Sequence, residues 1–62
     1  MMSPLYRAGD SVRILDGANK DAIGVVDHSV ASSGEWLYLV QRGEGASWVE
    51  EDRLAFEVPA GD

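Results

Sequence analysis

Short apolar runs alternate along the chain with breaks rich in glycine, aspartate and serine. Near the N-terminus, Val12 and Ile14 fall on one face of an extended segment, and Arg13 falls on the other. This alternation predicts a β-strand, because successive side chains of a strand point to opposite faces. The same reasoning predicts five strands, at residues 11–15, 22–30, 35–41, 46–49 and 55–58.

The third predicted strand is apolar on both faces. Trp36, Tyr38 and Val40 share one face, whereas Leu37 and Leu39 share the other. Such a strand is typical of the centre of a sheet, where both faces are covered. If the first set fills the core, Leu37 and Leu39 form an outward patch that a second subunit could cover. Homo-oligomerisation through these two leucines is therefore one hypothesis.

The breaks predict tight turns or loops at residues 16–21, 31–34 and 42–45. Gly24 lies inside the second predicted strand and indicates a bend, a bulge or a close approach of another backbone. Residues 50–54 predict a single helical or 3₁₀ turn that points Leu54 inward. Pro59 ends the last strand, because proline cannot donate to a ladder.

Five short strands with tight turns predict an all-β fold, either a small barrel or a sandwich. The 62 residues make one domain, with a core at about residues 5–58 and frayed ends at 1–4 and 59–62. A chain of about 60 residues buries only about 60% of its unfolded surface, so this core is thin. The sequence has no cysteine, which excludes disulfides and thiolate metal sites.

The formal net charge is −6, and most of it lies near the C-terminal end. Residues 43–62 carry six acids against Arg53, a sum of −5. This charge works against indiscriminate phosphate binding, which needs a positive field. No segment approaches the ~20 apolar residues of a membrane span, and residues 1–6 lack the features of a signal peptide. We therefore expect a cytoplasmic protein with no membrane partner.

A glycine-containing pattern extends over residues 9–26. Gly-Asp precedes the first predicted strand, and a Gly-x-x-Lys-x-x-x-Gly-x-Val pattern follows at Gly17, Lys20, Gly24 and Val26. This segment resembles a KOW motif, in which glycine usually stands at the position of Asp21. The resemblance implies a nucleic-acid or ribosome-associated domain as an alternative function. Its phosphate contacts would be Arg13, Lys20 and Arg42, which would bind weakly in a net-acidic chain.

Residues 34–58 resemble the second half of SH3-like domains. Gly34-Glu35-Trp36 opens one strand, and the sequence Trp-Val-x-x-x-x-Leu, which begins at Trp48, is similar to the end of bacterial SH3-like barrels. The resemblance implies a five-stranded SH3-like barrel with a short 3₁₀ turn before the last strand. Residues 50–54 lack the proline and tyrosine that eukaryotic SH3 domains carry there, so we expect no polyproline groove.

The plasmid-encoded dihydrofolate reductases that resist trimethoprim share this type of barrel. Their tetramer builds one site from a Val-Gln-Ile-Tyr strand, and the corresponding stretch here is Ala46-Ser47-Trp48-Val49. The glutamine and tyrosine are absent, so no catalytic residue carries over. A homo-oligomeric ligand-binding or reductase-like barrel remains a further alternative.

Other catalytic and metal-binding patterns are weak. In Asp27-His28-Ser29, neighbouring strand residues point to opposite faces, so His28 cannot bridge the other two as a triad requires. The contiguous acids 50–52 lack the alternating ligands of a calcium loop and suit the start of a short turn instead. We expect no enzyme activity, no catalytic residues, no metal and no cofactor.

The leading hypothesis is a non-catalytic protein-interaction module or small accessory subunit. Its predicted partner face is acidic and aromatic and consists of Trp48, Glu50, Glu51, Asp52 and Trp36. Trp48 is the better candidate for an exposed aromatic, because it lies at a strand edge, whereas Trp36 is expected to pack in the core. The expected partner is a protein with a basic surface.

Overall fold

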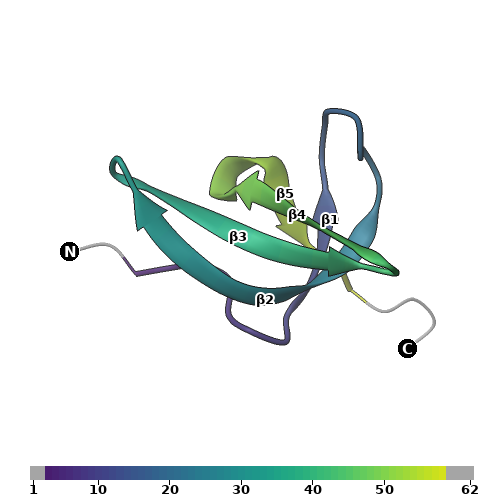
Figure 1. Cartoon of the computed structure of the whole chain (residues 1–62), viewed down its shortest axis with the longest axis horizontal. Helices are drawn as coiled ribbons and strands as arrows, with labels where there is room; N and C mark the ends of the chain where they lie inside the picture. Colours follow the sequence, from purple (N-terminus) through teal and green to yellow (C-terminus); the bar gives the residue numbers. More distant parts are fainter. Residues whose placement is uncertain (1–2, 59–62) are drawn as a thin grey trace.

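The strands of the protein form one antiparallel sheet with the order β4-β3-β2-β1-β5 (Figure 1). The computed structural model describes residues 3–58. Its elements are β1 (Ser11–Ile14), β2 (Ile23–Ser32), β3 (Glu35–Arg42), β4 (Gly45–Glu50), the 3₁₀ turn η1 (Glu51–Arg53) and β5 (Leu54–Phe56). The prediction of an all-β chain with five strands and one 3₁₀ turn is confirmed. In residues 3–58 no pairing joins β4 to β5, so the sheet does not close into a barrel.

Two predicted strands end two residues away from the ends that the structure shows, whereas the other predicted strand bounds lie within one residue of the structure. β2 continues to Ser32, so the second hairpin turn is shorter than the predicted break. β5 begins at Leu54, the residue expected to end the turn, and stops at Phe56 rather than Val58. Leu54 is buried, as predicted. Pro59 and the ends at residues 1–2 and 59–62 lie outside the described residues.

The second and third strands form a long, curved hairpin (Figure 1). Val26 pairs with Val40, but His28 pairs with Leu39, so Asp27 is an extra residue that forms a β-bulge. A bulge bends its strand and increases the local twist, which explains the curvature. Of the three features that Gly24 indicated, the structure shows a close backbone approach, because a Cβ there would collide with the carbonyl oxygen of Gln41.

One face of the sheet builds the core. Its eight buried apolar side chains are Tyr6, Val12, Ile14, Val26, Tyr38, Val40, Val49 and Leu54. Trp36 is partly buried and packs against this cluster. Leu37 and Leu39 lie on the opposite face, because strand residues alternate between faces, and both are half-buried. The predicted division of the third strand into an inward and an outward set is confirmed.

The loop between β1 and β2 depends on two left-handed residues. Gly17 has φ +86° and Asp21 has φ +72°. Glycine reaches this region without steric strain, and aspartate is one of the few other residues that tolerate it. The Asp21 N–H donates to the carbonyl of Ile14, which closes the loop onto β1. The position where the KOW pattern usually has glycine therefore takes a backbone conformation that glycine favours.

The described part of the chain contains no helix long and apolar enough to span a membrane.

Candidate functional site

The two tryptophans lie on opposite faces of the sheet. Trp48 on β4 is directly opposite Leu39 on β3, so it shares the outward face with the leucines. Trp36 has the same parity along β3 as the fully buried Tyr38, so it lies on the core side. The predicted partner face is thus divided into two separate surfaces.

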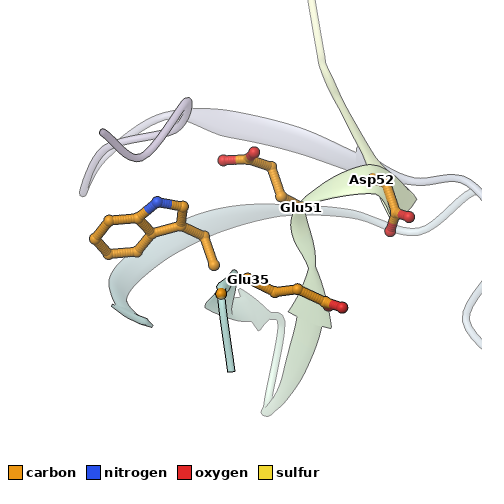
Figure 2. Close-up of a pocket in the computed structure, with 5 residues that line it drawn as sticks. Glu35, Glu51 and Asp52 are labelled. Carbon is orange, nitrogen blue, oxygen red and sulfur yellow. The ribbon is translucent and has the colours of Figure 1, made fainter. Parts of the chain in front are cut away.

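The first surface is a pocket of about 240 Å³, here called the acidic pocket, lined by Gly34, Glu35, Trp36, Glu51 and Asp52. The hairpin register explains why residues from two elements meet there. Leu37 pairs with Glu50 at the end of the β3–β4 ladder, so continuing the chain brings Trp36 towards Glu51 and Glu35 towards Asp52. In Figure 2, the carboxylates of Glu35 and Asp52 lie on one side, and the Glu51 carboxylate points the other way.

Glu51 is held by a hydrogen-bond network that reaches the core. The Tyr38 hydroxyl donates to Oε2 of Glu51 at 2.5 Å. The Leu5 N–H donates to the same Oε2 at 3.0 Å and lies 2.9 Å from the Tyr38 oxygen. The Tyr6 hydroxyl donates to the carbonyl of Leu54 at 2.9 Å, and its ring lies edge-on to Tyr38. Glu51 therefore fastens the N-terminal segment to β3.

Both phenols of this network stay protonated well beyond neutral pH. Burial raises the pKa of Tyr38 above its usual value, and the hydrogen bond to Glu51 raises it further. Burial also raises the pKa of Tyr6, with a smaller contribution from the negative charge of Glu51. Each hydroxyl can therefore act as a permanent hydrogen-bond donor at neutral pH.

The other two carboxylates of the acidic pocket have no cationic partner within residues 3–58. Ion pairs of the described residues join Arg13 to Glu57 at 2.9 Å and Arg53 to Asp16 at 2.5 Å, away from the pocket. Glu35 and Asp52 form no such pair and are exposed. The pocket therefore combines an indole wall with the carboxylates of Glu35 and Asp52, which form no ion pair within residues 3–58. The hydrogen bond to Asp16 is the main cause that raises the pKa of the neighbouring Arg53, and Asp52 contributes to it.

The second surface is the outer apolar face, formed by Val30, Leu37, Leu39 and Trp48. Cross-strand pairs align these residues in two rows, with Val30 beside Leu37 and with Leu39 beside Trp48. The Trp48 side chain is 50% exposed and Val30 is 41% exposed. His28 extends the second row, since its ring lies edge-on to Trp48 with centroids 5.4 Å apart. The expectation that Trp48 is exposed is confirmed.

Glu50 belongs to neither pocket nor network. Its cross-strand neighbour is Leu37, which places it at the border of the outer apolar face. Its Oε1 lies 3.9 Å from a guanidinium nitrogen of Arg53. Glu50 and Glu51 are neighbours in sequence, but only Glu51 reaches the acidic pocket.

The three cations of the nucleic-acid alternative have different environments. The hydrogen bond to Glu57 raises the pKa of Arg13 and keeps its guanidinium engaged. Arg42 donates to the hydroxyl of Ser47 at 2.9 Å. Lys20 is exposed in the β1–β2 loop. Two of the three are thus already bonded within the chain.

Neither a triad nor a metal site forms in the described residues. Nδ1 of His28 lies 2.5 Å from Oδ2 of Asp27, but Ser29 is opposite Tyr38 and so belongs to the core side of β2. Among residues 3–58, no three histidine or acidic side chains are arranged to hold a metal ion.

Sequence reasoning missed Glu35 and Gly34 in the pocket, and Leu5 and Tyr6 in the network. Glu35 was within reach of prediction. Once the turn is placed at residues 43–44, the cross-strand partners have numbers that sum to 87, so the ladder ends with Leu37 opposite Glu50 and leaves Glu35 near the 3₁₀ turn that follows. The N-terminal residues gave no such signal, because no local pattern connects them to β3 or η1.

Comparisons of the chain with protein-family models, with curated proteins and with solved structures give no match. The resemblance to SH3-like and KOW domains therefore stays a prediction. The acidic pocket and the outer apolar face are the two candidate functional surfaces of the described residues.

Proposed function

We propose that the protein is a non-catalytic interaction module that captures a cationic side chain of another protein in the acidic pocket. The observation that carries this proposal is the pocket of about 240 Å³ with one indole wall and two carboxylates free of any ion pair in residues 3–58. The fold we propose for it is SH3-like, with the sheet open between β4 and β5, and it is supported by five antiparallel strands and a 3₁₀ turn before the last one.

The chemistry of the pocket favours a lysine or arginine side chain. The face of an indole attracts a cation through its quadrupole, by about 0.5–1 kcal/mol at exposed sites. Glu35 and Asp52 add Coulombic attraction, which salt screens because both are exposed. Glu51 is held by Tyr38 and Leu5, so it contributes a fixed negative charge rather than a mobile one.

Peptide titration tests this function. The probe is a peptide with one arginine and one lysine among glycine and serine residues, followed through the NMR shift of the Trp36 indole N–H. We expect saturable shifts with a Kd of about 1 mM or tighter, since one side chain supplies only part of an interface. The double variant E35Q/D52N should weaken binding about fivefold, a loss of roughly 1 kcal/mol.

The matched control is Glu44→Gln, which removes an exposed carboxylate in the turn between β3 and β4. It changes the net charge but not the pocket. If Glu44→Gln weakens binding as much per removed charge as E35Q/D52N does, the peptide is attracted only by the overall negative charge of the protein, and the pocket assignment is wrong. The absence of any shift at Trp36 would have the same meaning.

A KOW-type nucleic-acid function is the second candidate, and two observations on the KOW-like segment favour it. The β1–β2 loop takes a left-handed turn at Asp21, and Gly24 allows close packing of β2 on β3. RNA gel shifts over a salt series test it, since phosphate contacts weaken steeply as salt rises. Binding that is lost in Lys20→Glu but kept in Asp52→Asn would favour this candidate over the interaction module.

A further inference from the structure

A second pocket lies along the edge of the sheet where β4 is not paired with another strand, and is here called the seam pocket. Strand β4 forms one wall, at Ser47, Trp48 and Val49. The end of β1, the β1–β2 loop and η1 form the other wall, which includes Asn19 and Arg53. The volume of about 130 Å³ is room for about four water molecules at about 30 Å³ each. A side-chain head group therefore fits, whereas a drug-sized ligand does not.

The seam pocket meets β4 at its edge. Ser47 is opposite Val40 and Val49 is opposite Tyr38, so both side chains lie on the core side. The side chain of Trp48 lies on the other face, because strand residues alternate between faces. A pocket that touches all three consecutive residues must lie beside the strand rather than on one face of it. The backbone of Trp48 is therefore part of the wall.

The backbone groups of Trp48 are free to bind a ligand. Arg42 and Gly45 close a two-residue hairpin, in which hydrogen-bonded pairs alternate with non-bonded pairs. Trp48 and Leu39 form a non-bonded pair, so the N–H and the C=O of Trp48 point away from β3. Within residues 3–58, no backbone group outside the sheet bonds to either of them. One residue thus offers the seam pocket a donor and an acceptor side by side.

The side chains make the seam pocket polar without a net charge. Nε of Arg53 donates to Oδ1 of Asp16 at 2.5 Å, so these two charges offset each other. The hydroxyl oxygen of Ser47 accepts from Arg42 at 2.9 Å and from Asn19 at 3.4 Å. Its acceptor sites are occupied, and its own proton can be donated to a ligand. This lining suits a neutral ligand that both donates and accepts hydrogen bonds.

We propose that the seam pocket binds a primary carboxamide, the side-chain group of glutamine or asparagine, from a partner protein. The carboxamide oxygen accepts from the Trp48 N–H, and its amino group donates to the Trp48 C=O. A carboxylate has no donor and an ammonium or guanidinium group has no acceptor, so each would leave one backbone group without a partner. An added β-strand has both groups, but it exceeds the space in front of the opposite wall.

The proposal does not depend on the acidic pocket, because the two pockets share no lining residue. The E35Q/D52N variant should therefore bind a carboxamide as the unchanged protein does. A loss of carboxamide binding in this variant would overturn the assignment to the seam pocket.

Titration of the ¹⁵N-labelled protein with propionamide tests the proposal. The backbone N–H of Trp48 should show a saturable downfield shift, with a Kd on the order of 10 mM for so small a ligand. The N–H of Val49 should move much less, since it is bonded to β3. Because the ligand is neutral, the Kd should stay the same between about 0.05 M and 0.5 M salt. The absence of a saturable shift at Trp48 overturns the proposal.

Three further ligands test the chemistry and the source of the carboxamide. Propanoate has a similar shape but lacks the donor, and should bind at least about tenfold more weakly. A peptide with one glutamine among glycine and serine residues should bind at least about threefold more tightly than propionamide. A peptide that binds no more tightly would overturn the partner protein as the source. Cytidine carries the same donor and acceptor on a base edge, and tighter binding of cytidine or propanoate than of propionamide would overturn the proposal.

A matched pair of variants tests the place of binding. Ala18→Leu enlarges an exposed side chain of the pocket wall and should weaken propionamide binding at least about fivefold. Ala46→Leu makes the same change at an exposed residue of β4 outside the pocket, and should leave binding unchanged. Equal effects of the two changes overturn the assignment. If Ala18→Leu loses its β-sheet circular dichroism spectrum, Asn19→Ala replaces it, and unchanged binding in Asn19→Ala contradicts the proposal.

Discussion

Trp36 and Trp48 come from one hairpin but have opposite surroundings. Trp36 packs against the core and lines a pocket with three carboxylates. Trp48 is half exposed on the outer apolar face, beside Leu39 and His28. The difference follows from the alternation of side chains along a strand. The β3–β4 register places Trp48 opposite Leu39, which lies on the outward face, whereas Trp36 lies on the same face as Tyr38.

The comparison shows that composition along the chain does not define a surface. Trp48, Glu50, Glu51 and Asp52 are nearly contiguous, yet strand alternation and the start of η1 distribute them over two sides. The core side also receives hydrogen bonds from Leu5 and Tyr6, which anchor it. Within residues 3–58, no hydrogen bond from the N-terminal segment reaches the outer apolar face, so we expect its residues to contribute less to stability.

The largest expected effect separates two neighbours on β3. Tyr38→Ala should lower the free energy of unfolding by about 3–5 kcal/mol, because it removes a fully buried ring. Leu39→Ala, on the outer apolar face and half-buried, should lower it by about 1–2 kcal/mol. Urea unfolding followed by circular dichroism measures both. Equal losses would mean that both faces of β3 stabilise the fold to the same extent, which would contradict the difference between the core side and the outer apolar face.

The strands and the inward set of β3 could be predicted because alternation is local. The split of Leu37 and Leu39 from Tyr38 needs only the period of two. The acidic pocket could be predicted only in part, since it needs a register as well as a period. The Leu5–Tyr38–Glu51 network joins residues 33 and 46 positions apart, and no local pattern carries that information.

Alkaline pH should destabilise the core side selectively. The pKa values of Tyr6 and Tyr38 are raised in the folded state, so above about pH 10 the unfolded chain loses phenolic protons that the folded chain keeps. The contribution of these raised pKa values to stability is fully present below that pH. The free energy of unfolding then falls as pH rises, by up to about 1.4 kcal/mol per pH unit for each tyrosine.

Thermal unfolding between about pH 8 and pH 11, with phenolate absorbance followed in parallel, measures this effect. Tyr6→Phe should reduce the slope of stability against pH, because one titrating group is gone. Lys20→Gln, a change at an exposed residue of the β1–β2 loop, is the control and should leave the slope unchanged. Phenolate absorbance that rises before any unfolding would contradict the burial of these rings.

The smallest expected change in stability distinguishes two adjacent acids, Glu51 on the core side and Glu50 at the border of the outer apolar face. Glu51→Ala removes the acceptor of the Tyr38 hydroxyl and of the Leu5 N–H, and should cost about 1–2 kcal/mol, since it leaves a buried hydroxyl without its acceptor. Glu50→Ala removes only a long contact to Arg53, and should change stability by less than about 0.5 kcal/mol. Urea midpoints with equal slopes give both values. Glu51→Gln should recover part of the loss, because its amide oxygen can still accept the hydrogen bond from the Tyr38 hydroxyl. A larger loss for Glu50→Ala than for Glu51→Ala would mean that the anchoring interactions lie on the outer side of the sheet.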